Sequence, residues 1–335
     1  MVLSASSVKA LNESGNSFAY VLRQTLFLSL SVVIAWVAMK LRAELWKPIA
    51  RTALLFSCAL LILPQIPGIG KTVGGNTNWI GIGSFTIQPS EFAKIGIILW
   101  CALRLRINAA KLVVPGIALV MALILLGRDL GTAVVVAGIV GGTLFIAGIP
   151  MRVFAILGSG IGVAFAFLVL TSSNRMNRFS AFFNPFAEEN YKGVGWQQAH
   201  SIMGLASGGP LGTGLGSSKQ KWGEELGLLG TLAVLTLFGL LILGIFRVAL
   251  RADNSFERYT CAGIGCWFAV QVILNIGTVI SVIPVVGVTL PFISYGGSSL
   301  LATFIAIGFV LGVLRRDPAI AAEIRERKAV RTARG

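Results

Sequence analysis

The chain has 335 residues, of which 55% are hydrophobic and 12% are charged. Soluble domains carry roughly a quarter charged residues, so this composition excludes a cytosolic enzyme, a disordered chain and a secreted disulfide scaffold. The net charge of +15 favours no nucleic-acid partner, because the cations stand in short clusters between apolar runs. The composition therefore predicts a multi-pass membrane protein.

Nine apolar runs predict an all-α, polytopic helical bundle with nine membrane spans. The third run is the shortest, and we expect its helix to extend back through Gln88. Glycine pairs four residues apart in several runs predict close packing between helices. The runs are residues 25–39, 49–64, 92–103, 112–126, 132–148, 153–170, 226–246, 259–283 and 298–314, and the pairs are Gly138 with Gly142, Gly158 with Gly162, and Gly308 with Gly312.

Basic residues in the connecting segments set the orientation, because Lys and Arg gather in cytoplasmic loops. Most of the 28 Lys and Arg residues fall in alternate connections and in a basic tail, 315–335, so this side is predicted to be cytoplasmic. Residues 171–225 then form one large extracytoplasmic loop within a single transmembrane domain, 1–335. Nine spans place Met1 outside, which predicts a tenth span upstream of this residue.

The cysteines and the histidine argue against a metal centre. Cys58, Cys101, Cys261 and Cys266 all fall inside apolar runs, so each is predicted to be a small buried side chain. His200 is the single histidine, and one histidine cannot supply a multi-histidine metal site or a Cys–His catalytic pair. The sequence therefore predicts no metal site built from these residues.

The segment that precedes the third apolar run carries two opposite charges. Pro89 suits the first turn of a helix, where its missing N–H costs nothing. Glu91 and Lys94 stand three residues apart, so they share a helical face and can pair. Because burying both charges is costly, this spacing favours a functional cavity over an interfacial pair that merely reaches toward water.

Further polar groups interrupt the apolar pattern in four places. Arg128 and Asp129 stand in a very short turn, for which solvated turn residues are the simpler interpretation. Residues 208–221 are glycine-rich and end in lysines, which fits a phosphate-binding loop and a flexible re-entrant turn equally well. Residues 291–299 form a polar break, which predicts a cavity wall. Gln271 and Asn275, four residues apart, predict an interhelical hydrogen bond.

Taken in chain order, four blocks resemble the SEDS glycosyltransferases, whose members include the division protein FtsW and the elongation protein RodA. The blocks are residues 83–94 around QPSEFAK, the DLGT that begins at Asp129, residues 195–222 around GGPLGTGLGSSKQKWG, and residues 290–299, LPFISYGGSS. With the opening SASSV the resemblance covers nearly the whole chain. SASSV and GLGSSKQKW are more similar to FtsW than to RodA.

This resemblance implies a ten-span bundle in the bacterial cytoplasmic membrane, at the division septum, that polymerises lipid II into glycan strands on the outer face. It implies a class B penicillin-binding protein and other division proteins as partners. Cations or a divalent metal would stabilise the departing pyrophosphate, a role that electrostatics favours for the basic residues of the large loop. The substrate-binding residues would be Gln88, Ser90, Glu91, Lys94, Asp129, Arg178, Lys219, Lys221, Ser294, Gly296 and Gly297.

One departure from the family concerns its catalytic aspartate. After the QK element the family continues with a segment of the type LPEAHxDFIFA, whose aspartate is regarded as catalytic. Here Lys221 and Trp222 run directly into Glu224 and Glu225, so that segment and its aspartate are absent. The chain is either damaged, or a noncatalytic relative that still binds substrate or partner, or an enzyme in which one of these glutamates replaces the base. A flippase for a lipid-linked precursor is a further alternative.

Overall fold

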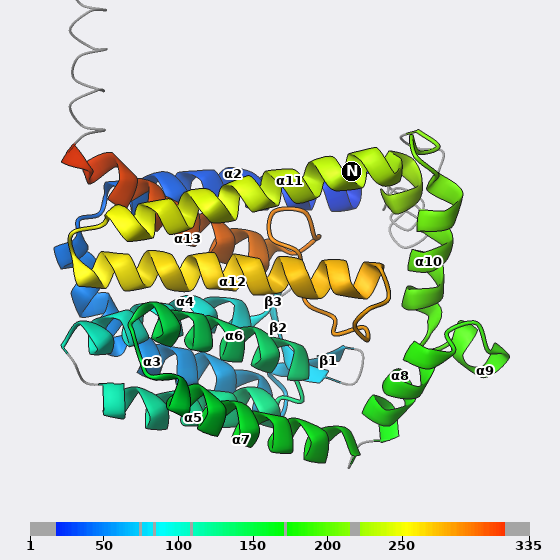
Figure 1. Ribbon diagram of the computed structural model, residues 1–335, viewed down its shortest axis with the longest axis horizontal. Coiled ribbons are helices and arrows are strands. Elements are labelled where there is room, and N and C mark those ends of the chain that lie inside the picture. The colour runs from blue at the N-terminus through cyan, green and yellow to red at the C-terminus, as the bar shows by residue number, and fades with distance from the viewer. Residues whose placement is uncertain are drawn as a thin grey trace, which may run out of the picture. The chain divides into compact units, whose positions relative to one another are not determined.

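The computed structural model describes residues 18–73, 76–82, 85–107, 110–170, 173–214 and 222–318. Over these ranges the chain is mainly helical, with one small sheet (Figure 1). The long helices are α2 (Ala19–Lys40), α3 (Ala43–Ile62), α4 (Pro89–Arg106), α5 (Ala110–Leu126), α6 (Leu130–Ile146), α7 (Met151–Leu170), α11 (Trp222–Arg251), α12 (Ser255–Val279) and α13 (Gly297–Arg316). The shorter elements are η1 (Leu63–Gln65), β1 (Gly70–Val73), β2 (Asn76–Ile82), β3 (Phe85–Ile87), α8 (Ser173–Phe183), α9 (Glu188–Tyr191) and α10 (Trp196–Gly208).

The long helices follow the predicted apolar runs, so the mainly helical fold is confirmed. α4 begins at Pro89, so the third run extends backwards as expected but stops one residue short of Gln88, whose backbone is extended. α4 carries Glu91, Lys94 and two arginines in its last turn, which lower its hydropathy. The number of spans stays a prediction. Among the described residues, the helices long and apolar enough to cross a membrane are five, namely Tyr20–Lys40, Ala43–Gln65, Gly227–Arg251, Ser255–Val279 and Gly297–Arg316.

The chain divides into two compact units. The bundle unit comprises Thr25–Ala147, Ile242–Phe268 and Gly296–Gly335, and the loop unit comprises Met1–Gln24, Gly148–Leu241 and Ala269–Tyr295. In the bundle unit, α4 is the central helix, since α3, α5, α6 and α13 all pack against it. Its core residues are apolar and almost completely buried, among them Ile97, Val135, Phe256 and Trp267.

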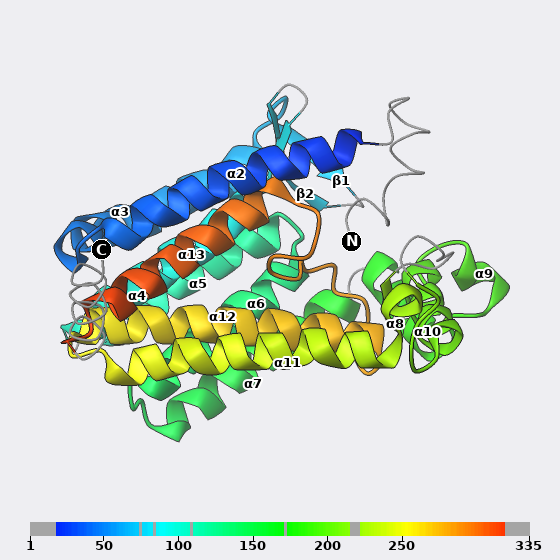
Figure 2. The same cartoon turned by 90° about the horizontal axis from the view of Figure 1, so that it is seen from above.

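Two of the three glycine pairs contain a glycine that allows a close helix contact. A Cβ atom on Gly308 would lie 2.5 Å from the carbonyl oxygen of Ala35, and one on Gly312 would lie 2.8 Å from that of Met39, so α13 packs directly on the backbone of α2. Figure 2 shows these two helices side by side. A Cβ on Gly142 would meet Cys266 of α12. In the part of the chain that the structure describes, nothing lies within 4 Å of a Cβ atom placed on Gly158 or Gly162, so close packing is not seen at that pair.

Replacing Gly308 by alanine is expected to lower the free energy of unfolding by about 1–3 kcal/mol, because overpacking forces the two backbones apart. The same replacement at Gly158, where nothing lies within 4 Å, is expected to be neutral or stabilising, since alanine favours a helix. Thermal unfolding of both variants in detergent tests this contrast. Shifts of equal size and sign would contradict a close contact at Gly308.

A three-stranded antiparallel sheet, in the order β1–β2–β3, precedes α4 and was not foreseen from the sequence. Gly70 pairs with Ile80, and Ile80 pairs in turn with Ile87. The strands are short, and glycines separate them, so they gave no alternating pattern long enough to recognise. Ile80 is the buried side chain of the central strand, and the sheet lies against the beginning of α4 and of α13 (Figure 2).

The loop unit contains the three short helices of the predicted large loop. The chain turns back after α10, where the N–H groups of Leu228 and Leu229 donate to the carbonyl oxygens of Gly209 and Pro210, at 2.9 and 3.1 Å. Gly227 has φ +61° and is the non-helical point within α11. A side chain there would collide with the backbone at Gly212, so glycine is required at this crossing.

Two expectations about buried polar and sulfur groups have different outcomes. All four cysteines are buried free thiols, as predicted. The amide of Asn275 instead donates to the carbonyl oxygen of Gln271 within α12, at 2.8 Å, and among the described residues no interhelical bond of this side chain is seen. The side-chain amide of Gln271 lies 3.5 Å from the hydroxyl of Thr289 in the segment that follows α12. The 3.6-residue period brings such a pair onto one face, where the helix's own carbonyl is the nearer acceptor.

Candidate functional site

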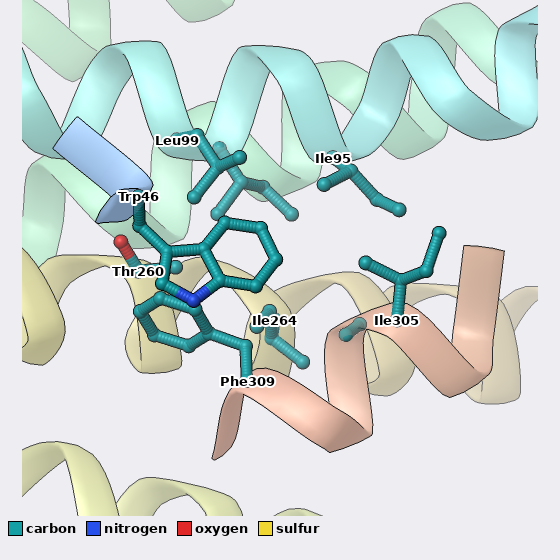
Figure 3. A pocket seen from close by; sticks show the side chains of 9 residues that line it. Trp46, Ile95, Leu99, Thr260, Ile264, Ile305 and Phe309 are labelled. Atoms are coloured by element: carbon teal, nitrogen blue, oxygen red, sulfur yellow. The ribbon is translucent and has the colours of Figure 1, made fainter. Parts of the chain in front are cut away.

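Two pockets of the bundle unit differ in chemistry. Figure 3 shows the first, in which the indole of Trp46 and the ring of Phe309 meet isoleucine and leucine side chains. The two rings lie 5.2 Å apart, edge to face. This apolar lining offers almost nothing to a charged or sugar-bearing ligand. The lining residues are Trp46, Ile95, Ile98, Leu99, Thr260, Ile264, Ile305, Ala306 and Phe309.

The second pocket lies where the sheet meets the beginnings of α4 and α6, and its lining mixes polar with apolar residues. Gln65, Asn78, Ser90 and Asp129 line it together with apolar residues. Among the described residues, the Ser90 hydroxyl and the Asn78 amide oxygen are buried and have no hydrogen-bond partner. Buried polar atoms without partners are rare, so this pocket is a candidate place for the polar group of a ligand.

The start of α4 joins two of the sequence blocks. The backbone N–H of Gln88 donates to the hydroxyl of Ser298 at 3.1 Å, across 210 positions of the sequence. Pro89 occupies the first turn of α4, where no intrahelical donor is needed. Gly297 begins α13, and a Cβ atom there would lie 2.6 Å from the ring of Phe27. The QPSEFAK block and the GGSS end of the last block are therefore neighbours.

Glu91 and Lys94 form a buried ion pair one turn into α4. The Lys94 ammonium donates to the Glu91 carboxylate at 2.8 Å, and the two side chains are 1% and 3% exposed, respectively. The ammonium also lies 4.8 Å from the ring centre of Trp267 on α12, a cation–π distance. Such burial rules out a pair that merely reaches toward water. It keeps two charges inside the bundle, where their desolvation costs free energy, and charges kept at such a cost usually serve a function.

Asp129 is the residue before α6, and it is more than a solvated turn residue. Its carboxylate accepts from the backbone N–H of Thr132 at 2.9 Å and from the Thr132 hydroxyl at 2.8 Å. The Asn78 side-chain amide donates to it at 2.6 Å, and that of Gln88 lies 3.4 Å away. Asp129 is 8% exposed. Arg128 has φ +60°, and this turn aims the carboxylate at the sheet.

Asn78 is the participant that sequence reasoning missed. It stands on β2, and its amide links the sheet to the carboxylate of Asp129. The only available signal was a polar residue beside Trp79 in a connecting segment, which has no distinctive pattern. Its position became informative only once the sheet was seen.

The remaining candidate residues are placed to different degrees. The Ser294 hydroxyl accepts from the backbone N–H of Leu290 at 2.8 Å, and Phe292 in the same turn has φ +64°. Gly296 immediately precedes α13, and its carbonyl oxygen accepts from Leu300. Arg178 lies on α8, and only its backbone is described. Lys219 and Lys221, like the opening SASSV, lie outside the described residues.

A divalent cation does not fit the residues in view. Hard cations such as Mg²⁺ prefer several carboxylate and carbonyl oxygens. In the part of the chain that the structure describes, no three His, Cys, Asp or Glu side chains come together in a group that could hold a metal ion. The Asp129 carboxylate is instead occupied by amide, hydroxyl and backbone donors.

Five helices long and apolar enough to cross a membrane, together with an ion pair buried inside a helical bundle, define a membrane protein. The chain belongs to the cell cycle protein family of FtsW, RodA and SpoVE, whose family model matches residues 1–318.

Curated relatives match over most of their length. A probable peptidoglycan glycosyltransferase FtsW of Trichlorobacter lovleyi is 37% identical, over 93% of this chain and 88% of the relative. One of Coxiella burnetii is 36% identical, over 93% and 91%. Stage V sporulation protein E of Bacillus subtilis is 36% identical, over 94% and 92%.

Solved structures show the same fold. A chain from a peptidoglycan synthase complex, described as coordinating polymerization and crosslinking, aligns with a TM-score of 0.77 and 27% identity, over 94% of this chain and 95% of that one. The rod shape determining protein RodA of Thermus thermophilus aligns with a TM-score of 0.66 and 26% identity, over 94% of each chain.

Proposed function

We propose that this chain is an FtsW-type peptidoglycan glycosyltransferase component, which binds lipid II for the synthesis of glycan strands during cell division. The observation that carries the proposal is membership of the family, since relatives named as FtsW glycosyltransferases are 36–37% identical over 93% of the chain. The bundle also keeps an ion pair and a carboxylate near the start of α4. A sugar–pyrophosphate ligand carries both hydroxyl groups and negative charge, which suits these groups.

The proposed reaction is a transfer of glycan to a sugar hydroxyl. The acceptor hydroxyl attacks the anomeric carbon of the donor, a carboxylate takes the hydroxyl proton, and the lipid pyrophosphate leaves. Glu91, Lys94 and Asp129 are proposed to belong to the substrate cavity with Gln88 and Ser90. Arg178, Lys219 and Lys221 are proposed to stabilise the departing pyrophosphate by charge. No step is assigned to a metal.

The base is the missing part of this mechanism. The alignment with the Trichlorobacter relative spans 340 positions, although only 93% of this chain takes part, so that relative has residues without a counterpart here. This agrees with the absence of the LPEAHxDFIFA segment. A proton acceptor must lie within hydrogen-bond reach of its proton. We therefore propose that the chain retains substrate binding and that catalysis needs the absent segment.

A class B penicillin-binding protein is the proposed partner. The structural neighbour with a TM-score of 0.77 comes from a peptidoglycan synthase complex described as coupling polymerization to crosslinking. A chain that binds this partner without performing the transfer would act as a division scaffold, which is the second candidate function. The absent aspartate is the observation that favours it. The proposed location of either activity is the division septum of the cytoplasmic membrane.

The deciding experiment supplies the purified chain and its partner with labelled lipid II and analyses the products on a gel. We expect no polymer from the chain as it stands. Insertion of an LPEAHxDFIFA-type segment after Gly223 is expected to restore polymer by a factor of about 10²–10⁴, the usual contribution of a general base. The matched control carries the same insertion with alanine in place of its aspartate.

Other results would point elsewhere. Polymer from the unmodified chain that disappears when Glu224 and Glu225 are both replaced by alanine would establish a substituted base. Partner binding without polymer from either form would establish the scaffold. Movement of lipid II across liposomes without polymer would establish the flippase.

A further inference from the structure

The short helix α8 of the loop unit has one buried side and one aromatic side. Ala181 is 1% exposed, and the carbonyl oxygen of Phe182 lies 3.4 Å from the amide nitrogen of Gln198, on α10. Phe179 and Phe183 are 44% and 72% exposed, and their ring centres lie 5.4 Å apart. Large aromatic side chains gathered on one exposed face mark a contact surface.

The place of α8 along the chain indicates what that surface contacts. Residues 153–170 of α7 carry no charge, which is why the sequence predicts a membrane span there, and Leu170 at their end is 70% exposed. α8 begins at Ser173. Ser173 is the third residue after Leu170, so their Cα atoms lie at most about 11 Å apart, and the aromatic helix starts where the predicted span of α7 ends. A partner protein would have no such fixed link to this helix, whereas the bilayer surface does.

The charges of α8 point in the same direction. The helix contains two arginines, Arg175 and Arg178, and no acidic residue. In the sequence, Arg175 precedes Phe179 by four residues and Arg178 precedes Phe182 by four. Arginine next to aromatic residues is the composition of helices that lie in the headgroup layer, with cations near lipid phosphate and rings at the acyl boundary.

We propose that α8 lies flat in the bilayer interface at the end of α7, with Phe179 and Phe183 inserted among phospholipid headgroups and acyl chains. This surface anchors the loop unit to the membrane. The proposal shares Arg178 with the proposed pyrophosphate-binding residues, but it rests on the exposed aromatic side chains and the sequence position of α8 and not on the transferase reaction.

Spin labels can test the position of each face in vesicles that contain phosphatidylglycerol and phosphatidylethanolamine. Cysteine is placed singly at Phe179, at Phe183 and at Asn177. Asn177 stands two positions before Phe179 and hence on the opposite side of the helix. The native cysteines are buried, so the unmodified chain measures background labelling. Accessibility to oxygen, which partitions into lipid, is compared with accessibility to a water-soluble nickel chelate.

We expect labels at 179 and 183 to be reached several-fold better by oxygen than by the chelate, and the label at 177 to show the reverse. Equal access of the chelate to all three positions would overturn the proposal. So would labels at 179 and 183 that become shielded from both reagents only after the penicillin-binding protein is added, since a protein would then be the occupant.

Discussion

Replacing Lys94 by methionine is expected to lower the free energy of unfolding by about 3–5 kcal/mol, because a buried carboxylate loses its ammonium partner. Glu91 is 3% exposed and lies 2.8 Å from Lys94, so water cannot replace the lost contact. Denaturant titration of the purified variant in detergent measures this change. Binding of labelled lipid II is expected to fall in parallel if the pair also faces the substrate.

Two controls separate the cost of charge from the cost of shape. The double variant with Glu91→Gln and Lys94→Met removes both charges at similar volume, and its stability is expected to return close to that of the unmodified chain. Lys47, which lies 3.9 Å from a carboxylate that is 72% exposed, is expected to tolerate methionine with a change below about 1 kcal/mol. A double variant as unstable as Lys94→Met would refute the charge explanation.

Replacing Asp129 by alanine is expected to lower the free energy of unfolding by about 3 kcal/mol. About 1 kcal/mol comes from the lost helix cap of α6, and the rest comes from the Asn78 and Thr132 donors that lose their acceptor. Denaturant titration beside the unmodified chain checks this value.

Asparagine at position 129 distinguishes capping from charge. Asparagine caps a helix as well as aspartate does, so Asp129→Asn is expected to keep the roughly 1 kcal/mol of the cap. It is expected to lose the contribution of the Asn78 and Thr132 side-chain donors, because its amide has only one oxygen acceptor. A loss of stability equal to that of Asp129→Ala would show that the charge, and not the cap, holds α6 and β2 together.

The sequence predicted the helical architecture well, because long apolar runs have few alternatives in a membrane. The start of α4 at Pro89 and the pairing of Glu91 with Lys94 followed from local rules, since both depend on residues within one helical turn. The sheet could not be predicted in this way. Its register depends on cross-strand pairs such as Gly70 with Ile80. No periodic pattern of hydrophobic residues within one strand predicts which residues pair.

The environment of Asp129 shows the same limit at the candidate site. Spacing alone favoured an ordinary turn, and the resemblance to the family was needed to make the residue a candidate. Its contact with Asn78 joins positions 51 residues apart. Contacts of that kind depend on how separate elements pack, so neither composition nor helical spacing could supply them. Lys219 and Lys221 remain predictions, because they lie outside the described residues.

The hydrogen bond between the backbone of Gln88 and the hydroxyl of Ser298 has a mechanical consequence. It joins Gln88, the residue before α4, to Ser298 in the first turn of α13. A ligand that displaces the glycine-rich segment before α13 must therefore either break this hydrogen bond or move the N-terminus of α4 with it. We therefore expect a displacement of either segment to be felt by the other at this hydrogen bond.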